Sequence, residues 1–191
     1  MIMLRTFRIT IFFIIYNTVI INDLYSKEYK INQKESSVTF SATHADNKFV
    51  GQINNYQAEI FFDQNNLANS KINIIFAMDS FKTGNNMYDK ALPTMDWFNI
   101  KNYPESYFNS SKIIQKSDGN FQIFGDLTIK NITKKINFDF KLQDFKKNLV
   151  NVISNFTINR LDFKIGQESD FSGQWVDLQI KINLNLITKG E

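Results

Sequence analysis

The chain has 191 residues, a formal net charge of +3, 43% hydrophobic residues and 21% charged residues. This composition is typical of one globular domain, and so small a charge gives no support for nucleic-acid binding. Cysteine is absent and there is one histidine, which excludes disulfides, thiol catalysis and cysteine-based metal sites.

The N-terminal segment has the pattern of a secretory signal peptide. Arg5 and Arg8 precede a nearly continuous apolar run over residues 9–21, and Ser26 is a small residue at a candidate cleavage point. The apolar run is shorter than the ~20 residues of a spanning helix. We therefore predict a signal peptide over 1–26, a mature domain over 27–191, and a periplasmic or secreted location. An uncleaved membrane anchor is the alternative.

Beyond residue 26, apolar and polar residues alternate with a period of two. The apolar members of these runs are Val38-Phe40-Ala42, Tyr56-Ala58-Ile60-Phe62, Ile72-Ile74-Phe76-Met78, Phe121-Ile123-Gly125-Leu127-Ile129, Ile136-Phe138-Phe140-Leu142, Phe156-Ile158 and Val176-Leu178-Ile180-Ile182-Leu184-Leu186. Successive side chains of a strand point to opposite faces, so each run predicts one apolar and one solvated face. This is typical of an antiparallel sheet.

Turn-forming residues separate the runs. Residues 63–66 and 117–120 combine Asp, Asn, Ser and Gly, and Asn131 can adopt a left-handed backbone. Short strands at this spacing predict an all-β barrel or sandwich. From Asn86 to Ile100 apolar residues recur at helical spacing, and Pro93 interrupts the middle. We expect one or two helical turns on a connection there.

The chain is rich in aromatic residues, with 19 Phe, 7 Tyr and 2 Trp. An eight-stranded barrel either fills its interior with side chains or leaves room for one ligand. Alternation alone favours a filled core. The residues that strand phase predicts to line an interior cavity are Phe40, Ala42, Ile74, Phe76, Phe108, Ile123, Leu127, Phe138, Phe140, Ile158, Leu178 and Ile180.

His44 ends the strand that begins at Val38, and it falls on the inward phase. It is either a partly buried histidine with one hydrogen bond or a polar group at a pocket mouth that orients a ligand headgroup. Trp97 and Phe98 are assigned to the same mouth.

The search for catalytic motifs is negative. The chain has no G-x-S-x-G turn and no glycine-rich phosphate loop. Asp89 and Asp96 are seven residues apart, a spacing more typical of surface or capping carboxylates than of an acid–base pair. We predict no catalytic residue, no metal ligand and no cofactor.

Several blocks of sequence occur in the order and spacing of one known family. The blocks are Ser36–Phe40 followed by His44, Thr83-Gly84, Asp89–Phe98, Tyr103-Pro104 with Phe108 and Ser110, Gly125–Lys134, Arg160–Phe163 and Trp175. From about Tyr29 to Leu186 the chain resembles the YceI-like proteins, lipocalin-like barrels that bind polyisoprenoid lipids. Ala91 stands where that family has a histidine, and Asn131 and Lys164 replace glycines.

The resemblance implies an antiparallel, about eight-stranded lipocalin-like barrel with a short helical connection near residues 86–100. It implies non-enzymatic binding or transport of a long isoprenoid lipid, such as a quinone or its precursor, in the periplasm. The expected partners are that lipid, a membrane contacted transiently, and a second copy of the chain in a homodimer. The alternatives are a structural or stress-related barrel with a filled core, and an enzyme that acts on a lipid.

Overall fold

A computed structural model describes residues 27–146 and 148–190. The predicted signal peptide therefore lies outside the described residues. The strands are β1 (Lys27–Ile31), β2 (Ser37–His44), β3 (Asn47–Ile53), β4 (Tyr56–Phe62), β5 (Lys71–Ala77), β6 (Phe81–Lys82), β7 (Glu105–Gln115), β8 (Phe121–Ile129), β9 (Ile132–Lys146), β10 (Leu149–Asn159) and β11 (Gln179–Gly190). The helical elements are α1 (Asn86–Ala91) and the 3-10 turns η1 (Leu67–Asn69), η2 (Met78–Ser80) and η3 (Arg160–Phe163).

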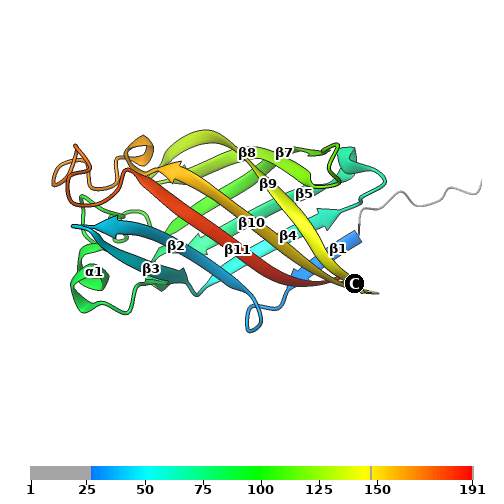
Figure 1. The fold of residues 1–191 in the computed structure, drawn as a ribbon, viewed down its shortest axis with the longest axis horizontal. Helices are drawn as coiled ribbons and strands as arrows, with labels where there is room; N and C mark the ends of the chain where they lie inside the picture. Colours follow the sequence, from blue (N-terminus) through cyan, green and yellow to red (C-terminus); the bar gives the residue numbers. More distant parts are fainter. Residues whose placement is uncertain (1–26, 147, 191) are drawn as a thin grey trace, which may run out of the picture.

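The sheet closes on itself into an antiparallel barrel (Figure 1). Strands β1, β4, β5, β7, β8, β9, β10 and β11 pair in that order, and β11 pairs back to β1 to complete an eight-stranded cylinder. β11 also pairs with β2 along residues 181–185, and β2, β3 and β6 extend the wall from that branch. The predicted eight-stranded antiparallel barrel is confirmed.

The alternation seen in the sequence sets which side chains enter the barrel. Along β8 buried and half-buried residues alternate without interruption from Phe121 to Ile129. The left-handed turn after β8 is also confirmed, since Lys130 and Asn131 have φ of 51° and 59°. A tight turn there lets β9 pair back on β8 in register, which keeps the apolar phase of both strands inside.

Two details differ from the sequence pattern or refine it. The last strand begins at Gln179 rather than at Val176, because Val176 makes an isolated bridge with His44 and belongs to a long loop. The helical connection is confirmed as α1, whose N-terminus is capped by the Asn85 side chain accepting from the Met87 N–H at 2.9 Å.

The two ends of the barrel carry different elements (Figure 1). One end carries α1, the connection after it and the loop between η3 and β11. The opposite end carries the C-terminus and the first residues of β1. Within residues 27–146 and 148–190, no helix has the length and apolarity needed to cross a bilayer.

Candidate functional site

The barrel interior contains two neighbouring cavities. The larger has a volume of about 140 Å³ and lies toward the α1 end, and the smaller has a volume of about 70 Å³ and lies toward the opposite end. Five apolar side chains line both cavities and form the wall between them. They are Ile74, Phe108, Phe138, Leu184 and Leu186. The two cavities are therefore chambers in series along the barrel axis.

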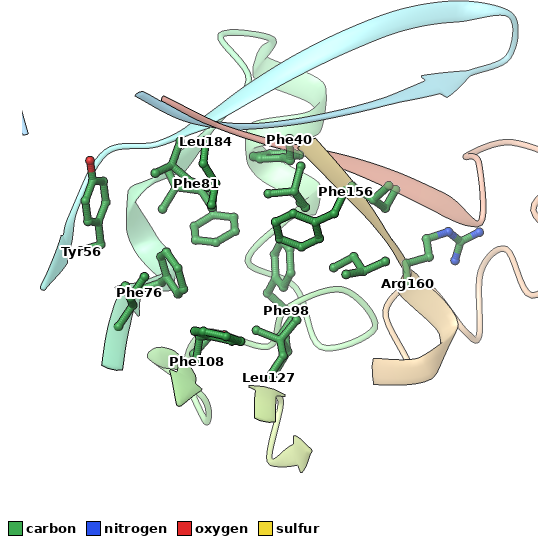
Figure 2. A pocket seen from close by; sticks show the side chains of 18 of the residues that line it. Phe40, Tyr56, Phe76, Phe81, Phe98, Phe108, Leu127, Phe156, Arg160 and Leu184 are labelled. Atoms are coloured by element: carbon green, nitrogen blue, oxygen red, sulfur yellow. The ribbon is translucent and has the colours of Figure 1, made fainter. Parts of the chain in front are cut away.

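Aromatic rings give the larger chamber its shape (Figure 2). The Phe40 ring lies 5.7 Å from that of Phe81, which meets Phe98 edge-on at 5.2 Å. Phe138 and Phe156 stack with their ring centroids 4.1 Å apart and nearly parallel. Both of these rings are only half-buried although they point into the barrel. Inward side chains that keep accessible surface are what an incompletely filled interior produces.

A cap made of two chain segments closes the α1 end of the larger chamber. Leu92 and Phe98 come from the connection after α1, and Ile165 and Val176 come from the loop between η3 and β11. All four are buried. We call residues 92–100 and 160–178 together the cap.

Arg160 and Asp170 form a buried ion pair under the cap. Their side chains are 1% and 4% exposed, and Arg160 Nη2 lies 2.8 Å from the Asp170 carboxylate. The guanidinium donates to the carboxylate and to the carbonyl oxygens of Ile165, Gly166, Asp170, Val176 and Asp177. These acceptors use all its N–H groups. Arg160 therefore holds the loop in place and has no donor left for a ligand.

The electrostatics of the pair follow from its burial. Burial lowers the pKa of Arg160, and the carboxylates of Asp170 and Asp96 partly oppose that shift. Burial alone would raise the pKa of Asp170, but backbone N–H donors from Val176 and Trp175 and the charge of Arg160 outweigh it and lower the pKa. Both groups are held in their charged forms.

A second polar cluster joins the two segments of the cap. Asp96 accepts hydrogen bonds from the N–H groups of Glu168 and Ser169 at 2.9 and 3.0 Å. Lys130 Nζ donates to the carbonyl oxygens of Asp96 and Lys164 at 3.1 and 2.9 Å. Burial raises the pKa of Asp96, but the Ser169 and Glu168 hydrogen bonds and Lys130 outweigh this and lower it.

Most polar side chains that line the chambers are already hydrogen-bonded within the protein. The Ser106 hydroxyl donates to Met78 Sδ, Ser154 to the Asp139 carbonyl at 2.6 Å, and Thr188 to the Val150 carbonyl at 3.0 Å. The Tyr56 hydroxyl, at the edge of the larger chamber in Figure 2, is buried without a partner of normal geometry. Burial raises its pKa, and an interaction with Ser36 partly offsets that shift.

The sequence matches the model of the YceI-like domain over residues 29–187. The chain belongs to the YceI-like family. A UPF0312 protein of Vibrio campbellii (strain ATCC BAA-1116) is 30% identical over 115 residues, which cover 59% of this chain and 61% of that protein. A UPF0312 protein of Yersinia enterocolitica is 26% identical over 118 residues, covering 60% and 61%. The chain spans about three fifths of the length of these curated relatives.

Solved structures share the fold. BcnA of Burkholderia cenocepacia superposes with a TM-score of 0.78 at 22% identity, covering 83% of this chain and 99% of BcnA. The YCEI protein of Campylobacter jejuni gives 0.64 at 27% identity, covering 74% and 84%. A polyisoprenoid-binding domain from Saccharophagus degradans gives 0.67 at 10% identity, covering 85% and 98%. The YceI-like barrel is thus kept across wide sequence divergence.

Most residues predicted to line the YceI-like interior do line a chamber. Those in the larger one, the smaller one or both are Phe40, Ile74, Phe76, Phe108, Ile123, Leu127, Phe138, Phe140, Ile158 and Ile180. Ala42 and Leu178 are not among the lining residues. Ala42 is buried near the end of β2, and Leu178 precedes β11 and lies against Gly173 in the cap. Both strand runs extend past the chambers. Contact of the lining residues with a ligand stays a prediction.

The predicted pocket mouth is a closed cap. Trp97 and Phe98 line the larger chamber from this cap. His44 lines neither chamber, and its Nδ1 is hydrogen-bonded to the Tyr88 hydroxyl at 2.9 Å. This contact joins β2 to α1. Across residues 27–146 and 148–190, no cluster of three His, Asp or Glu side chains could hold a metal ion.

Neither Arg160 nor Asp170 is among the predicted site residues, although the sequence pattern indicates that Arg160 is buried. Arg160 continues the inward phase of Phe156 and Ile158. A charge on that phase must be buried and therefore needs a partner. The partner lies in an irregular loop ten residues later, where no periodicity points to it.

Proposed function

We propose that this YceI-like protein binds a long isoprenoid lipid, such as a quinone or its precursor, inside the barrel and without catalysing a reaction. The observation that supports this most directly is the pair of apolar chambers in series with a shared wall. A hydrocarbon chain entering them gains about 25 cal/mol for each Å² of apolar surface removed from water. This gain needs no directional contact, which suits a lining of Phe, Ile and Leu side chains.

The chambers are small for a long lipid. Pockets for drug-sized ligands typically measure about 300–1,000 Å³, whereas these chambers measure about 140 and 70 Å³. Even joined, the two chambers stay below that range, so a long chain fits only when the shared wall moves aside and the side chains around it repack. Phe138 is half-buried and borders both chambers, so its ring has space to move into on either side once its contact with Phe156 separates.

The polar groups of the lining favour a hydrocarbon tail over a polar headgroup. The donors in the lining already bond protein acceptors; they belong to Arg160, Ser106, Ser154 and Thr188. If these donors turned toward a ligand, their present acceptors would stay buried without a hydrogen bond. A ligand with a large polar head would therefore bury its tail and leave the head outside. Selectivity should depend on tail length and branching more than on head chemistry.

The likeness to the Saccharophagus degradans polyisoprenoid-binding domain supports the isoprenoid part of the proposal. As part of the same proposal, the N-terminal segment exports the protein to the periplasm. There it carries its lipid, contacts a membrane transiently and associates as a homodimer. We propose no catalytic step, because His44 is bonded to Tyr88, and neither it nor Asp96 is among the side chains lining the described chambers.

Mass spectrometry of lipid extracted from protein purified from its native compartment tests the proposal. We expect an isoprenoid in the wild-type extract and little in an Ile180→Trp variant, whose new ring would fill the larger chamber. Val50→Trp is the matched control, because Val50 is 58% exposed on the outside of β3 and should leave the lipid bound. An empty wild type that also takes up no added quinone would support the filled-core alternative.

A further inference from the structure

The α1 end of the barrel offers no ready entrance for a ligand. The cap over the larger chamber is fastened by the Arg160–Asp170 pair and by the Asp96 and Lys130 contacts. Opening it would expose a buried ion pair and break several hydrogen bonds at once. A ligand that entered here would have to supply the free energy lost in all of these contacts.

Packed aromatic rings lie toward the opposite end of the barrel. Phe121 meets Phe62 edge-on at 5.4 Å and stacks on Phe140 at 5.3 Å. Phe62, Phe121 and Phe140 are all buried. We call these three residues the aromatic floor. Buried, closely packed side chains therefore lie toward both ends of the barrel.

The wall between β9 and β10 is paired along only part of its length. The last pair of that ladder is Phe140 with Ser154. Both strands continue toward the cap, yet residues 132–139 of β9 pair with β8 and residues 155–159 of β10 pair with β11. The Ser154 hydroxyl bonds the Asp139 carbonyl where the ladder ends. Figure 1 shows β9 and β10 diverging toward the α1 end of the barrel. We call this part of the wall the β9–β10 split.

The larger chamber lies directly behind this split. Ile136 and Phe138 line it from β9, and Phe156 and Ile158 line it from β10. All four are half-buried. The parallel stack of Phe138 on Phe156 spans the two strands just past the last backbone pair. Phe138 also belongs to the wall between the chambers. One ring therefore faces the split, the larger chamber and the smaller chamber.

We propose that the β9–β10 split is the site where the hydrocarbon chain of the ligand enters, with the Phe138–Phe156 stack as its latch. This inference rests on the proposed lipid-binding function and adds a route to it. Separating the two rings opens the barrel wall sideways without a change in the cap or the floor. The same movement of Phe138 joins the chambers, so entry and extension of the binding site are one event.

A reversible lock across the split tests the route. The variant Asn137→Cys with Thr157→Cys places two thiols on exposed outward positions of β9 and β10, and the native chain has no cysteine to interfere. The matched control is Thr128→Cys with Thr133→Cys, a pair in the intact β8–β9 ladder whose hydroxyls lie 2.8 Å apart. A short bifunctional thiol reagent can replace the disulfide in both variants.

Uptake is followed by the fluorescence of retinol, an isoprenoid alcohol, mixed with each protein. We expect the oxidised 137–157 variant to take up retinol far more slowly than its reduced form, and the control pair to load equally fast in both states. Equal rates for the locked and reduced 137–157 variant would overturn the route while leaving the binding function intact. A wild type that takes up neither retinol nor quinone would instead overturn the function, and the route with it.

A second pair of variants separates the split from the floor. Phe156→Leu removes the latch stack, and Phe121→Leu removes a comparable stack in the aromatic floor. We expect Phe156→Leu to speed retinol release roughly threefold to tenfold, the equivalent of one aromatic pair, and Phe121→Leu to leave the rate unchanged. Faster release from Phe121→Leu but not from Phe156→Leu would place the entrance at the floor and refute the proposal.

Discussion

The cap and the barrel interior are held together in opposite ways. In the cap, few charged side chains make many specific contacts, and Arg160 alone bonds six acceptor atoms. In the interior, aromatic and aliphatic side chains pack without directional bonds and leave two chambers. Directional contacts fix one geometry, whereas loose apolar packing tolerates several. The fold thus combines a rigid closure with an interior that can repack around a guest.

The largest expected effect concerns the cap. Arg160→Leu leaves the Asp170 carboxylate buried without its partner, so we expect a loss of about 3–5 kcal/mol in the free energy of unfolding. The measurement is urea denaturation of the unliganded protein. Lys135→Leu is the control, because Lys135 pairs with Asp126 while its side chain is 87% exposed, and its loss should stay within about 0.5 kcal/mol. Similar losses for both variants would mean that the cap is not the rigid element.

The next effect concerns how fully each chamber is packed. Ile123 is 2% exposed and lines the smaller chamber, whereas Ile180 is half-buried and lines the larger one. We expect Ile123→Trp to overpack and destabilise by about 1–3 kcal/mol, and Ile180→Trp to cost less while blocking lipid uptake. Denaturation and retinol uptake are measured on both variants. A larger stability loss for Ile180→Trp would show that the larger chamber has no room to repack.

The barrel and most of its lining residues could be predicted from the sequence, but the contacts of the cap could not. Period-two alternation is a local signal, and it placed Phe138 and Ile180 on the inward face because each strand carries its own phase. The same signal misplaced Leu178, since the apolar run begins in the loop before β11 starts at Gln179. The Arg160–Asp170 pair depends on how the loop folds back over the barrel. Long-range loop geometry of this kind leaves no periodic trace in the sequence.

Two tyrosines allow a comparison, with a smaller expected effect, between a hydroxyl that is hydrogen-bonded and one that is only packed. The Tyr88 hydroxyl bonds His44 at 2.9 Å, whereas the buried Tyr56 hydroxyl has no partner of normal geometry. We expect Tyr88→Phe to lower the free energy of unfolding by about 0.5–1.5 kcal/mol and Tyr56→Phe to be neutral or stabilising. Urea denaturation midpoints distinguish the two. A clear loss for Tyr56→Phe would reveal a hydrogen bond in solution, with Ser36 as the first partner to examine.

The smallest effect is the pH dependence of the cap. The pKa of Asp96 is lowered in the folded protein, because hydrogen bonds from Ser169 and Glu168 and the charge of Lys130 outweigh the effect of burial. A carboxyl with a lowered folded pKa adds stability above its unfolded pKa, about 3.9, and that stability is lost as the pH falls toward the folded value. The stability difference between wild type and Asp96→Asn should therefore be largest near neutral pH.

That difference should shrink below about pH 3.9, where protonation brings the wild-type carboxyl toward the neutral state of the variant. Urea denaturation of both proteins across the acid range measures it. A difference that stays constant with pH would mean that the Asp96 contacts depend on shape and not on charge. The shrinking difference would instead show that protonation of Asp96 weakens the contacts that hold the cap closed.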